Sequence, residues 1–263
     1  MQQRARDLLA GRLVVVTGAS AGIGRAFVES VASPGTRFVL VARRRPELES
    51  LAEAVWARGG EALVQAVDLR DPDAARSAAV DSLVAMGVPD LVVANAGHSI
   101  ARGVLATVER PDSVLRNAAV NYTGAVAHAL PLLGVMAERG SGHLIGSSTA
   151  NARLTVPGWG PYAASKAAWD AWLRAAAPEL ARHGLATSIV AFPLVDTAMA
   201  APTRGRRRAL SPEQAAGWLA RAVVTRQARV APSWLKLAEV AHAAAPTVAA
   251  RLTGRFSLRL AQR

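Results

Sequence analysis

Cysteine is absent from this chain of 263 residues, and lysine occurs only twice. Without thiols the protein can form neither disulfides nor thiolate nucleophiles, and it has no cysteine ligands for zinc or iron–sulfur sites. The five histidines are scattered along the chain without metal-binding spacing, so we expect no metal site. No uninterrupted apolar run is long enough for a membrane span, because polar residues and Pro131 break up the most apolar stretch, 117–137. Since the N-terminus also lacks the apolar core of a signal peptide, we expect a cytoplasmic protein.

Acidic residues are few compared with basic ones, 19 against 31, so the formal net charge is +12. Arginine supplies all the basic residues except Lys166 and Lys236, and most arginines are scattered; the denser clusters are at 43–45 and 204–208. Because the chain has no recognisable helix-turn-helix or aromatic stacking motif, we expect no specific nucleic-acid partner. Hydrophobic residues make up 51% of the chain, which is enough to bury a core and excludes wholesale disorder.

Short apolar runs alternate with longer helical stretches, which predicts an α/β fold with a doubly wound parallel sheet and helices on both faces. No linker or internal repeat divides the sequence, so we expect one domain over 1–263, with a substrate loop at about 194–210 and a variable tail at 232–263. The predicted strands are 13–16, 38–41, 62–67, 91–94, 143–146, 187–192 and 228–231, and the predicted helices are 22–32, 46–58, one from Pro72, 112–138, 162–182 and 212–226.

A glycine-rich turn follows the first predicted strand, in the sequence Thr17-Gly18-Ala19-Ser20-Ala21-Gly22-Ile23-Gly24. Gly18 permits a tight turn, Gly22 allows the backbone to approach a pyrophosphate, and Gly24 allows the next helix to pack closely on the strand. The N-terminus of that helix would face the anion. Because the glycines lie between a strand and a helix, the turn predicts a dinucleotide site.

Arginines follow the second predicted strand, where a site for NAD would carry an acidic residue for the ribose 2′-hydroxyl. The strand ends at Ala42, and Arg43, Arg44 and Arg45 come next. A guanidinium binds a 2′-phosphate bidentately, whereas a carboxylate would repel it. We therefore predict NADP(H) as the cofactor in preference to NAD(H), with Arg43 as the first contact and Arg44 as the second. For Arg44 and Arg45 the alternative, a solvated start of the next helix, is equally open.

Tyr162 and Lys166 are four residues apart in a predicted helix, so their polar ends share one face. A tyrosine hydroxyl has a pKa near 10, too high for acid–base work at neutral pH unless a nearby positive charge stabilises the anion. Lys166 is one of only two lysines in the chain and lies where it can provide that charge. The pair alone could be an exposed tyrosine and lysine on a helix, but the upstream glycine turn makes that alternative weak.

These motifs, together with Asn95-Ala96-Gly97 after the fourth predicted strand, resemble the short-chain dehydrogenase/reductase family over residues 13 to about 197. The resemblance implies a Rossmann-like fold and NADP(H)-dependent interconversion of a carbonyl and an alcohol, with Tyr162 as the acid/base. It also implies an apolar small-molecule substrate and a homodimer or homotetramer. The cofactor contacts that it implies are Gly18, Ser20, Gly22, Ile23, Gly24, Arg43, Arg44, Asp68, Leu69, Asn95, Ala96, Gly97, Tyr162, Lys166, Pro193, Val195 and Thr197.

The family also places a serine about thirteen residues before the tyrosine, where its hydroxyl orients the substrate oxygen. Here Ser148 lies fourteen residues before Tyr162 and Thr149 thirteen. We choose Ser148 because it matches the second serine of the family's Ser-Ser pair, with Thr149 as the alternative. Asn121 matches the family's helix asparagine, which holds a water behind the lysine. The predicted catalytic residues are thus Asn121, Ser148, Tyr162 and Lys166.

Other functions of the same fold remain open at this point, namely an epimerase or dehydratase, an acyl-thioester reductase, or a regulatory protein with little turnover. The tail also has two interpretations. Its apolar residues alternate with arginines, which suits weak peripheral contact with an anionic membrane. The alternative, which we slightly favour, is that the tail packs against a neighbouring subunit.

Overall fold

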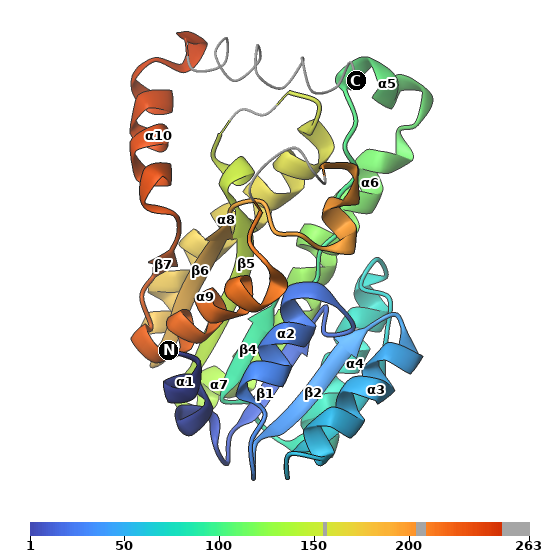
Figure 1. Cartoon of the computed structure of the whole chain (residues 1–263), viewed down its shortest axis with the longest axis vertical. Helices are drawn as coiled ribbons and strands as arrows, with labels where there is room; N and C mark the ends of the chain where they lie inside the picture. The colour runs from blue at the N-terminus through green and yellow to red at the C-terminus, as the bar shows by residue number, and fades with distance from the viewer. Residues whose placement is uncertain (155–156, 204–208, 249–263) are drawn as a thin grey trace.

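The computed structural model describes residues 1–154, 157–203 and 209–248 and contains one seven-stranded sheet (Figure 1). The strand order is β3-β2-β1-β4-β5-β6-β7, and every neighbouring pair is parallel. This confirms the doubly wound α/β fold. The strands are β1 (Leu13–Thr17), β2 (Arg37–Ala42), β3 (Glu61–Ala66), β4 (Leu91–Ala94), β5 (Gly142–Thr149), β6 (Leu185–Phe192) and β7 (Arg229–Val230).

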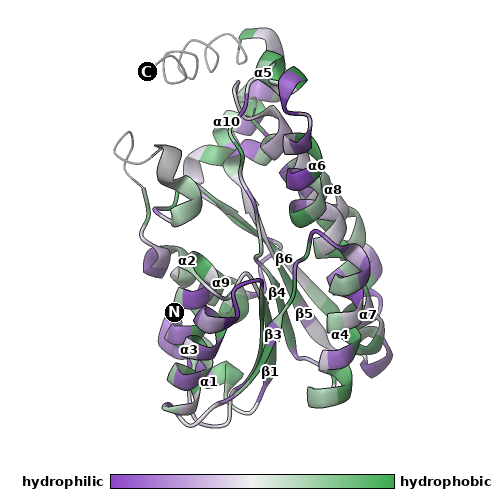
Figure 2. Ribbon diagram, turned by 90° about the vertical axis from the view of Figure 1, so that its right-hand side faces the viewer, coloured by the Kyte–Doolittle hydropathy of each residue, from purple (hydrophilic) through white to green (hydrophobic). Residues whose placement is uncertain are grey.

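Helices cover both faces of the sheet (Figure 2). Because both faces are covered, the central strands are continuous apolar runs, and β1 is buried at every residue. Val14 and Val16 join the core under one layer, whereas Leu13 and Val15 join the core under the other. The first layer holds α1 (Gln2–Leu9), α2 (Gly22–Val31), α3 (Arg45–Trp56) and α9 (Pro212–Thr225), and the second holds α4 (Pro72–Met86), α7 (Gly124–Arg139) and α8 (Gly160–Ala181).

The start of α9 follows from its sequence. Ser211 accepts a hydrogen bond from the Gln214 amide at 3.2 Å, and the Gln214 side chain accepts one from the Ser211 amide at 2.9 Å. Pro212 occupies the first helical position, where its missing N–H costs nothing. This reciprocal capping box confirms the predicted helix start.

The long helix predicted over 112–138 is interrupted. It consists of α6 (Asp112–Ala118), a π-helical turn over Ala119–Thr123, and α7. A π turn inserts one extra residue into the helix and is often found at functional sites. The elements that the sequence analysis did not predict are α1, α5 (Val104–Glu109) and the 3₁₀ helices Ala150–Ala152 and Ala198–Thr203. Helix α10 (Ser233–Ala244) lies in the predicted tail, whose sequence has helical periodicity up to Pro246.

Backbone contacts join the two ends of the predicted substrate loop. Val195 forms a parallel bridge with Leu210, and the Leu210 amide donates to the Leu194 carbonyl at 2.9 Å. These contacts close the base of the loop beside β6. The arginine cluster at 204–208 and the tail from 249 onward lie outside the described residues.

One helical stretch among the described residues, Asp112–Arg139, is long and apolar enough to cross a membrane by length and composition alone. Half of its most apolar window is buried inside the molecule, as in the core helix of a globular fold. The cytoplasmic location expected from the sequence stays a prediction.

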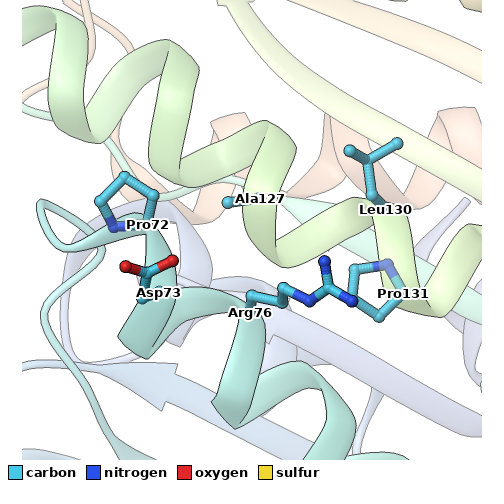
Figure 3. A pocket seen from close by; sticks show the side chains of 6 residues that line it. All are labelled: Pro72, Asp73, Arg76, Ala127, Leu130 and Pro131. Atoms are coloured by element: carbon cyan, nitrogen blue, oxygen red, sulfur yellow. The ribbon is translucent and has the colours of Figure 1, made fainter.

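A pocket of about 380 Å³ lies between α4 and α7 (Figure 3). It is lined by Pro72, Asp73, Arg76, Ala127, Leu130 and Pro131. None of these residues was predicted to bind the cofactor or to act in catalysis.

Candidate active site

The glycine turn joins β1 to α2 at the carboxyl edge of the sheet, and its geometry requires glycine. Gly18 has φ +70° and Gly22 has φ +57°, both in the left-handed region. A Cβ on Gly18 would lie 2.9 Å from Ala96 Cα, and a Cβ on Gly24 would lie 2.5 Å from the Gly18 carbonyl oxygen. On Gly22 a Cβ would lie 3.0 Å from Thr197 Cγ2. The turn therefore touches the segments after β4 and β6, as a dinucleotide cradle should.

Hydrogen bonds join the ends of β1, β4 and β5. Thr17 Oγ1 accepts from the backbone amides of Asn95 and Ala96 at 3.0 and 2.9 Å. Asn95 Nδ2 donates to the Thr17 carbonyl at 3.2 Å, and Ser147 Oγ donates to Asn95 Oδ1 at 3.1 Å. The strand order reverses between β1 and β4, and ligands of open α/β sheets bind at such a switch point.

Two exposed arginines lie at the end of β2. Arg44 Nη2 donates to Ser20 Oγ in the glycine turn at 3.1 Å, and its Nη1 lies 3.2 Å from Glu47 Oε1. Arg43 forms no hydrogen bond or ion pair within the described part of the chain, yet its charge acts on Asp68. Guanidinium groups beside Ser20 fit a ribose 2′-phosphate, and the buried Ala42 leaves no carboxylate there to repel it.

Two of the predicted cofactor contacts, Asp68 and Leu69, lie after β3. Burial by itself would raise the pKa of Asp68, but hydrogen bonds from Arg70 and the charges of Arg70 and Arg43 hold it below its usual value. Asp68 therefore stays ionised and bound to Arg70. Leu69 is buried next to it.

The remaining predicted cofactor residues surround the glycine turn or follow β6. Ile23 packs against the core from the start of α2. Val195 is buried, Pro193 is half-buried, and Thr197 reaches Gly22. All of the predicted cofactor residues thus follow the carboxyl ends of the strands or line the start of α8.

Tyr162 and Lys166 lie on α8 beside the end of β5. Burial raises the pKa of Tyr162 to about 12, and a hydrogen bond with the Thr149 hydroxyl opposes part of that shift. Lys166 is buried, and its Nζ donates to the Ser147 carbonyl at 3.2 Å. Desolvation lowers the pKa of Lys166 to about 8. At neutral pH the phenol is protonated and the ammonium keeps its charge.

The hydroxyl beside Tyr162 belongs to Thr149 and not to Ser148, the residue chosen from the sequence. Ser148 Oγ donates to Asp170 Oδ1 at 3.3 Å. Successive side chains of a strand point to opposite faces, so Ser147 and Thr149 share one face of β5 and Ser148 lies on the other. The count of thirteen residues before the tyrosine therefore selects the hydroxyl that lies beside Tyr162, whereas the Ser-Ser match selects one that contacts Asp170.

Asn121 lies in the π turn and binds the segment after β4. Its Oδ1 accepts from the His98 amide at 2.8 Å, and its Nδ2 donates to the His98 carbonyl at 2.8 Å and to Ser165 Oγ at 2.9 Å. A Cβ on Gly97 would lie 3.3 Å from Asn121 Oδ1 and 3.6 Å from Lys166 Nζ. Gly97 thus lies between the side chains of Asn121 and Lys166.

Three side chains near the site were not assigned to catalysis or cofactor binding from the sequence. Ser165 Oγ donates to the Tyr162 carbonyl at 2.8 Å and connects it to Asn121. Trp159, which precedes α8, lies edge-on to Tyr162 with 5.8 Å between ring centroids. Met199 lies 3.6 Å from the position of a Cβ on Gly97. The position of Ser165 within Tyr162-Ala-Ala-Ser-Lys166 was a usable signal for the first of these.

The described residues contain no group of three or more histidine, aspartate or glutamate side chains that could hold a metal ion.

Comparisons with known proteins agree with this geometry. The family model "short chain dehydrogenase" matches residues 12–208. A fatty acyl-CoA reductase of Acinetobacter baylyi is 34% identical over 245 residues, which cover 92% of this chain and 83% of that protein. A fatty acyl-CoA reductase of Mycobacterium tuberculosis is 34% identical over 227 residues, 85% of this chain and 77% of that protein. A metagenomic short-chain oxidoreductase solved in complex with NADP has 31% identity and a TM-score of 0.73, over 86% of this chain and 99% of that one.

Proposed function

Because the chain belongs to the short-chain dehydrogenase/reductase family of oxidoreductases, we propose that it uses NADP(H) to interconvert a carbonyl and an alcohol. The observation that carries this proposal is the meeting of the Tyr162 and Thr149 hydroxyls near buried Lys166, at the sheet edge that also holds the glycine turn. When bound there, the nicotinamide supplies the hydride that reaches the carbonyl carbon.

Tyr162 acts as the general acid in the reducing direction. Its phenol is protonated at neutral pH, because burial raises its pKa to about 12, and it gives the proton to the carbonyl oxygen. The Thr149 hydroxyl binds the same oxygen and orients it. In the oxidising direction Tyr162 takes the proton back, and the Lys166 ammonium lowers the cost of the phenolate.

Lys166 has a second role, which is to bind the ribose hydroxyls of the cofactor. Asn121 lies behind it, and the amide side chain of Asn121 is fully engaged by His98 and Ser165. A water that relays protons between Lys166 and solvent would therefore be held by the backbone carbonyl of Asn121.

The cofactor preference rests on the end of β2. Arg43 and Arg44 are exposed there, and Arg44 already reaches Ser20 of the glycine turn. Bidentate, charge-assisted hydrogen bonds make a guanidinium a strong partner for phosphate. The related metagenomic oxidoreductase binds NADP, which supports the same choice.

An acyl thioester is the second candidate substrate, because two relatives are fatty acyl-CoA reductases. Hydride addition to the thioester carbonyl, with a proton from Tyr162, gives a hemithioacetal. Loss of the thiol then leaves an aldehyde, so each NADPH oxidised releases one thiol. Apolar Trp159 and Met199 beside the site suit an aliphatic substrate.

We also propose the oligomeric state of the protein. The family resemblance favours a homodimer or homotetramer. Tyr162, Lys166, Thr149 and Asn121 converge in one place, which counts against a regulatory protein with little turnover.

The test follows NADPH absorbance against a panel of aldehydes, ketones and acyl-CoA esters, with a thiol reagent to detect released CoA. Tyr162→Phe should abolish turnover and leave the Kd for NADPH within about twofold, because only the proton donor is lost. Lys166→Ala should weaken both turnover and NADPH binding. Full activity in the Tyr162→Phe protein would refute the mechanism, and thiol release in step with NADPH oxidation would select the acyl-thioester candidate.

A further inference from the structure

A buried carboxylate that the proposed mechanism does not use lies behind the reaction centre. Asp170 is on α8, four residues after Lys166, and is only 2% exposed. A buried charge is very costly unless other groups pair with it and satisfy its hydrogen bonds. The partners of Asp170 therefore indicate its role.

Those partners lie at the two ends of the turn that carries Thr149. Ser148 Oγ donates to Asp170 Oδ1 at 3.3 Å. Arg153 Nε donates to Asp170 Oδ2 at 3.0 Å, and Arg153 Nη2 lies 2.9 Å from the same oxygen. One carboxylate thus holds the segment 148–153 at its first and last residues, with Thr149 between them.

The same carboxylate is rigidly connected to Tyr162, because both are on α8. They are eight residues apart, or about 12 Å along the helix axis. The contacts of Asp170 with the turn therefore set where Thr149 lies relative to Tyr162. Arg174 Nε, one helical turn further on, also donates to Asp170 Oδ2 at 3.0 Å and helps to balance its charge.

The ion cluster continues to the C-terminal helix α10. Arg153 Nη1 lies 3.8 Å from Glu239 Oε2, and Arg229 Nη1 donates to that oxygen at 2.7 Å. Leu235 of α10 is fully buried and packs with Ala150, the residue after Thr149. The turn is thus held by α8 on one side and supported by α10 on another.

We propose that Asp170 is a positioning residue, which holds the turn 148–153 so that the Thr149 hydroxyl meets Tyr162, and that Arg153 and Glu239 extend this clamp to α10. The inference rests on the proposed function, since Thr149 and Tyr162 are the groups that act there. It differs from a purely structural role in one respect, because loss of the clamp should change the reaction centre and not only the stability of the fold.

Asp170→Asn tests this directly, because it removes the charge and keeps the size. We expect kcat to fall about tenfold or more, since small displacements of catalytic groups are costly, and KM for NADPH to stay within about twofold. Arg153→Lys should act in the same direction, because an ammonium cannot replace the guanidinium fork.

Asp90→Asn is the matched control. Asp90 also lies between two arginines, with Arg12 Nη1 at 3.2 Å and Arg139 Nη1 at 3.8 Å, but it precedes β4 at the opposite edge of the sheet. Its substitution should lower the unfolding temperature without changing kcat.

A second readout does not depend on turnover. The chain has two tyrosines, Tyr122 and Tyr162, so ¹³Cζ-tyrosine NMR in a Tyr122→Phe background reports on Tyr162 alone. Asp170→Asn should move this resonance towards its position in Thr149→Val, whereas Asp90→Asn should leave it in place. A different outcome is that the resonance moves in Asp170→Asn while none of the tested carbonyl compounds supports NADPH oxidation by the wild-type protein. In that case the proposed function fails and the positioning role of Asp170 stands.

An unchanged Tyr162 resonance and an unchanged kcat in folded Asp170→Asn would overturn the inference. A loss of kcat in Asp90→Asn as large as that in Asp170→Asn would overturn it as well. If Asp170→Asn does not fold, the same two measurements on Arg153→Lys decide the question.

Discussion

Consecutive side chains of β5 point to opposite faces of the sheet, so only one of the neighbouring hydroxyls of Ser148 and Thr149 can lie beside Tyr162. Thr149 shares its face with Ser147, whose carbonyl accepts from Lys166 at 3.2 Å. Ser148 points the other way and meets Asp170. The two neighbouring residues therefore have different contacts, and in the proposed mechanism only Thr149 lies at the reaction centre.

Substitution distinguishes these two residues. We expect Thr149→Val to lower kcat about 100-fold, since the loss of one donor to a reacting oxygen typically costs that much. Ser148→Ala should cost less than about fivefold, because a single hydrogen bond contributes about 1 kcal/mol. Steady-state rates of the two variants, measured side by side, check this. If Ser148→Ala lowers kcat more than Thr149→Val does, the hydroxyl that orients the substrate oxygen belongs to Ser148 instead.

Arg43 at the end of β2 has no hydrogen-bond or ion-pair partner among the residues that the structure describes, so its charge is available to a ligand. Arg43→Asp should lower kcat/KM for NADPH about 100-fold and shift the preference to NADH, because a carboxylate repels the 2′-phosphate and accepts from the 2′-hydroxyl. Arg45→Asp is the control, since Arg45 is also exposed but its Nη1 lies 3.6 Å from Glu49 Oε1 along α3. A wild-type protein that uses NADH better than NADPH would contradict the assignment.

Among the elements, α7 contains an ionisable group in the core. His128 is buried, its Nε2 has no hydrogen-bond partner within the described residues, and desolvation lowers its pKa to about 4. His143 on β5 is buried as well, with a pKa of about 4 from the same cause, and its Nε2 lies 2.9 Å from Ser188 Oγ. Both side chains are neutral in the folded protein well below the pH at which they charge in the unfolded chain.

The pH dependence of stability follows from this difference. Below pH 6.5 the unfolded state binds protons that the folded state does not, so each histidine removes about 1.4 kcal/mol of the free energy of unfolding per pH unit, down to about pH 4. Replacing His128 with Leu should remove one of the two contributions and flatten the slope. Denaturant unfolding at pH 7, 6 and 5 measures it. A wild-type free energy of unfolding that does not change over this range would contradict the burial of these rings.

At the scale of the whole molecule, exposed apolar side chains gather at one end. Helices α5 and α10 both lie there, away from α1 and α3 (Figures 1 and 2). Leu105 on α5 is 85% exposed, and Leu237 on α10 is 76% exposed. The sequence suggested weak contact with an anionic membrane for the tail, and with the net charge of +12 these exposed side chains extend that prediction to this end of the molecule.

Vesicle sedimentation tests this surface. At low salt the full chain should sediment with vesicles that contain anionic lipid, and Leu105→Glu should reduce the bound fraction about tenfold, since burying one leucine contributes about 1.5–3 kcal/mol. Val84→Glu is the matched control, because Val84 is also 85% exposed but lies on α4. If the wild-type chain does not sediment with anionic vesicles, packing against another subunit explains the alternation of apolar residues and arginines in the tail.

The sequence by itself determined the features that local pattern encodes. Apolar runs predicted all seven strands of the sheet, because a strand covered on both faces must be apolar along its length. The glycines at 18, 22 and 24 and the four-residue spacing of Tyr162 and Lys166 are equally local, since they follow from a turn and from helical periodicity. Short amphipathic elements such as α1 and α5 were missed, because their few residues carry too weak a period.

Only the tertiary structure decided what depends on residues far apart in the chain. The choice between Ser148 and Thr149 depends on which face of β5 packs against Tyr162 of α8. The contacts of Asp170 with Arg153, and of Arg153 with Glu239, join positions 17 and 86 residues apart. No periodicity records such pairs, because their energy comes from burial and charge compensation that exist only once the helices have packed on the sheet.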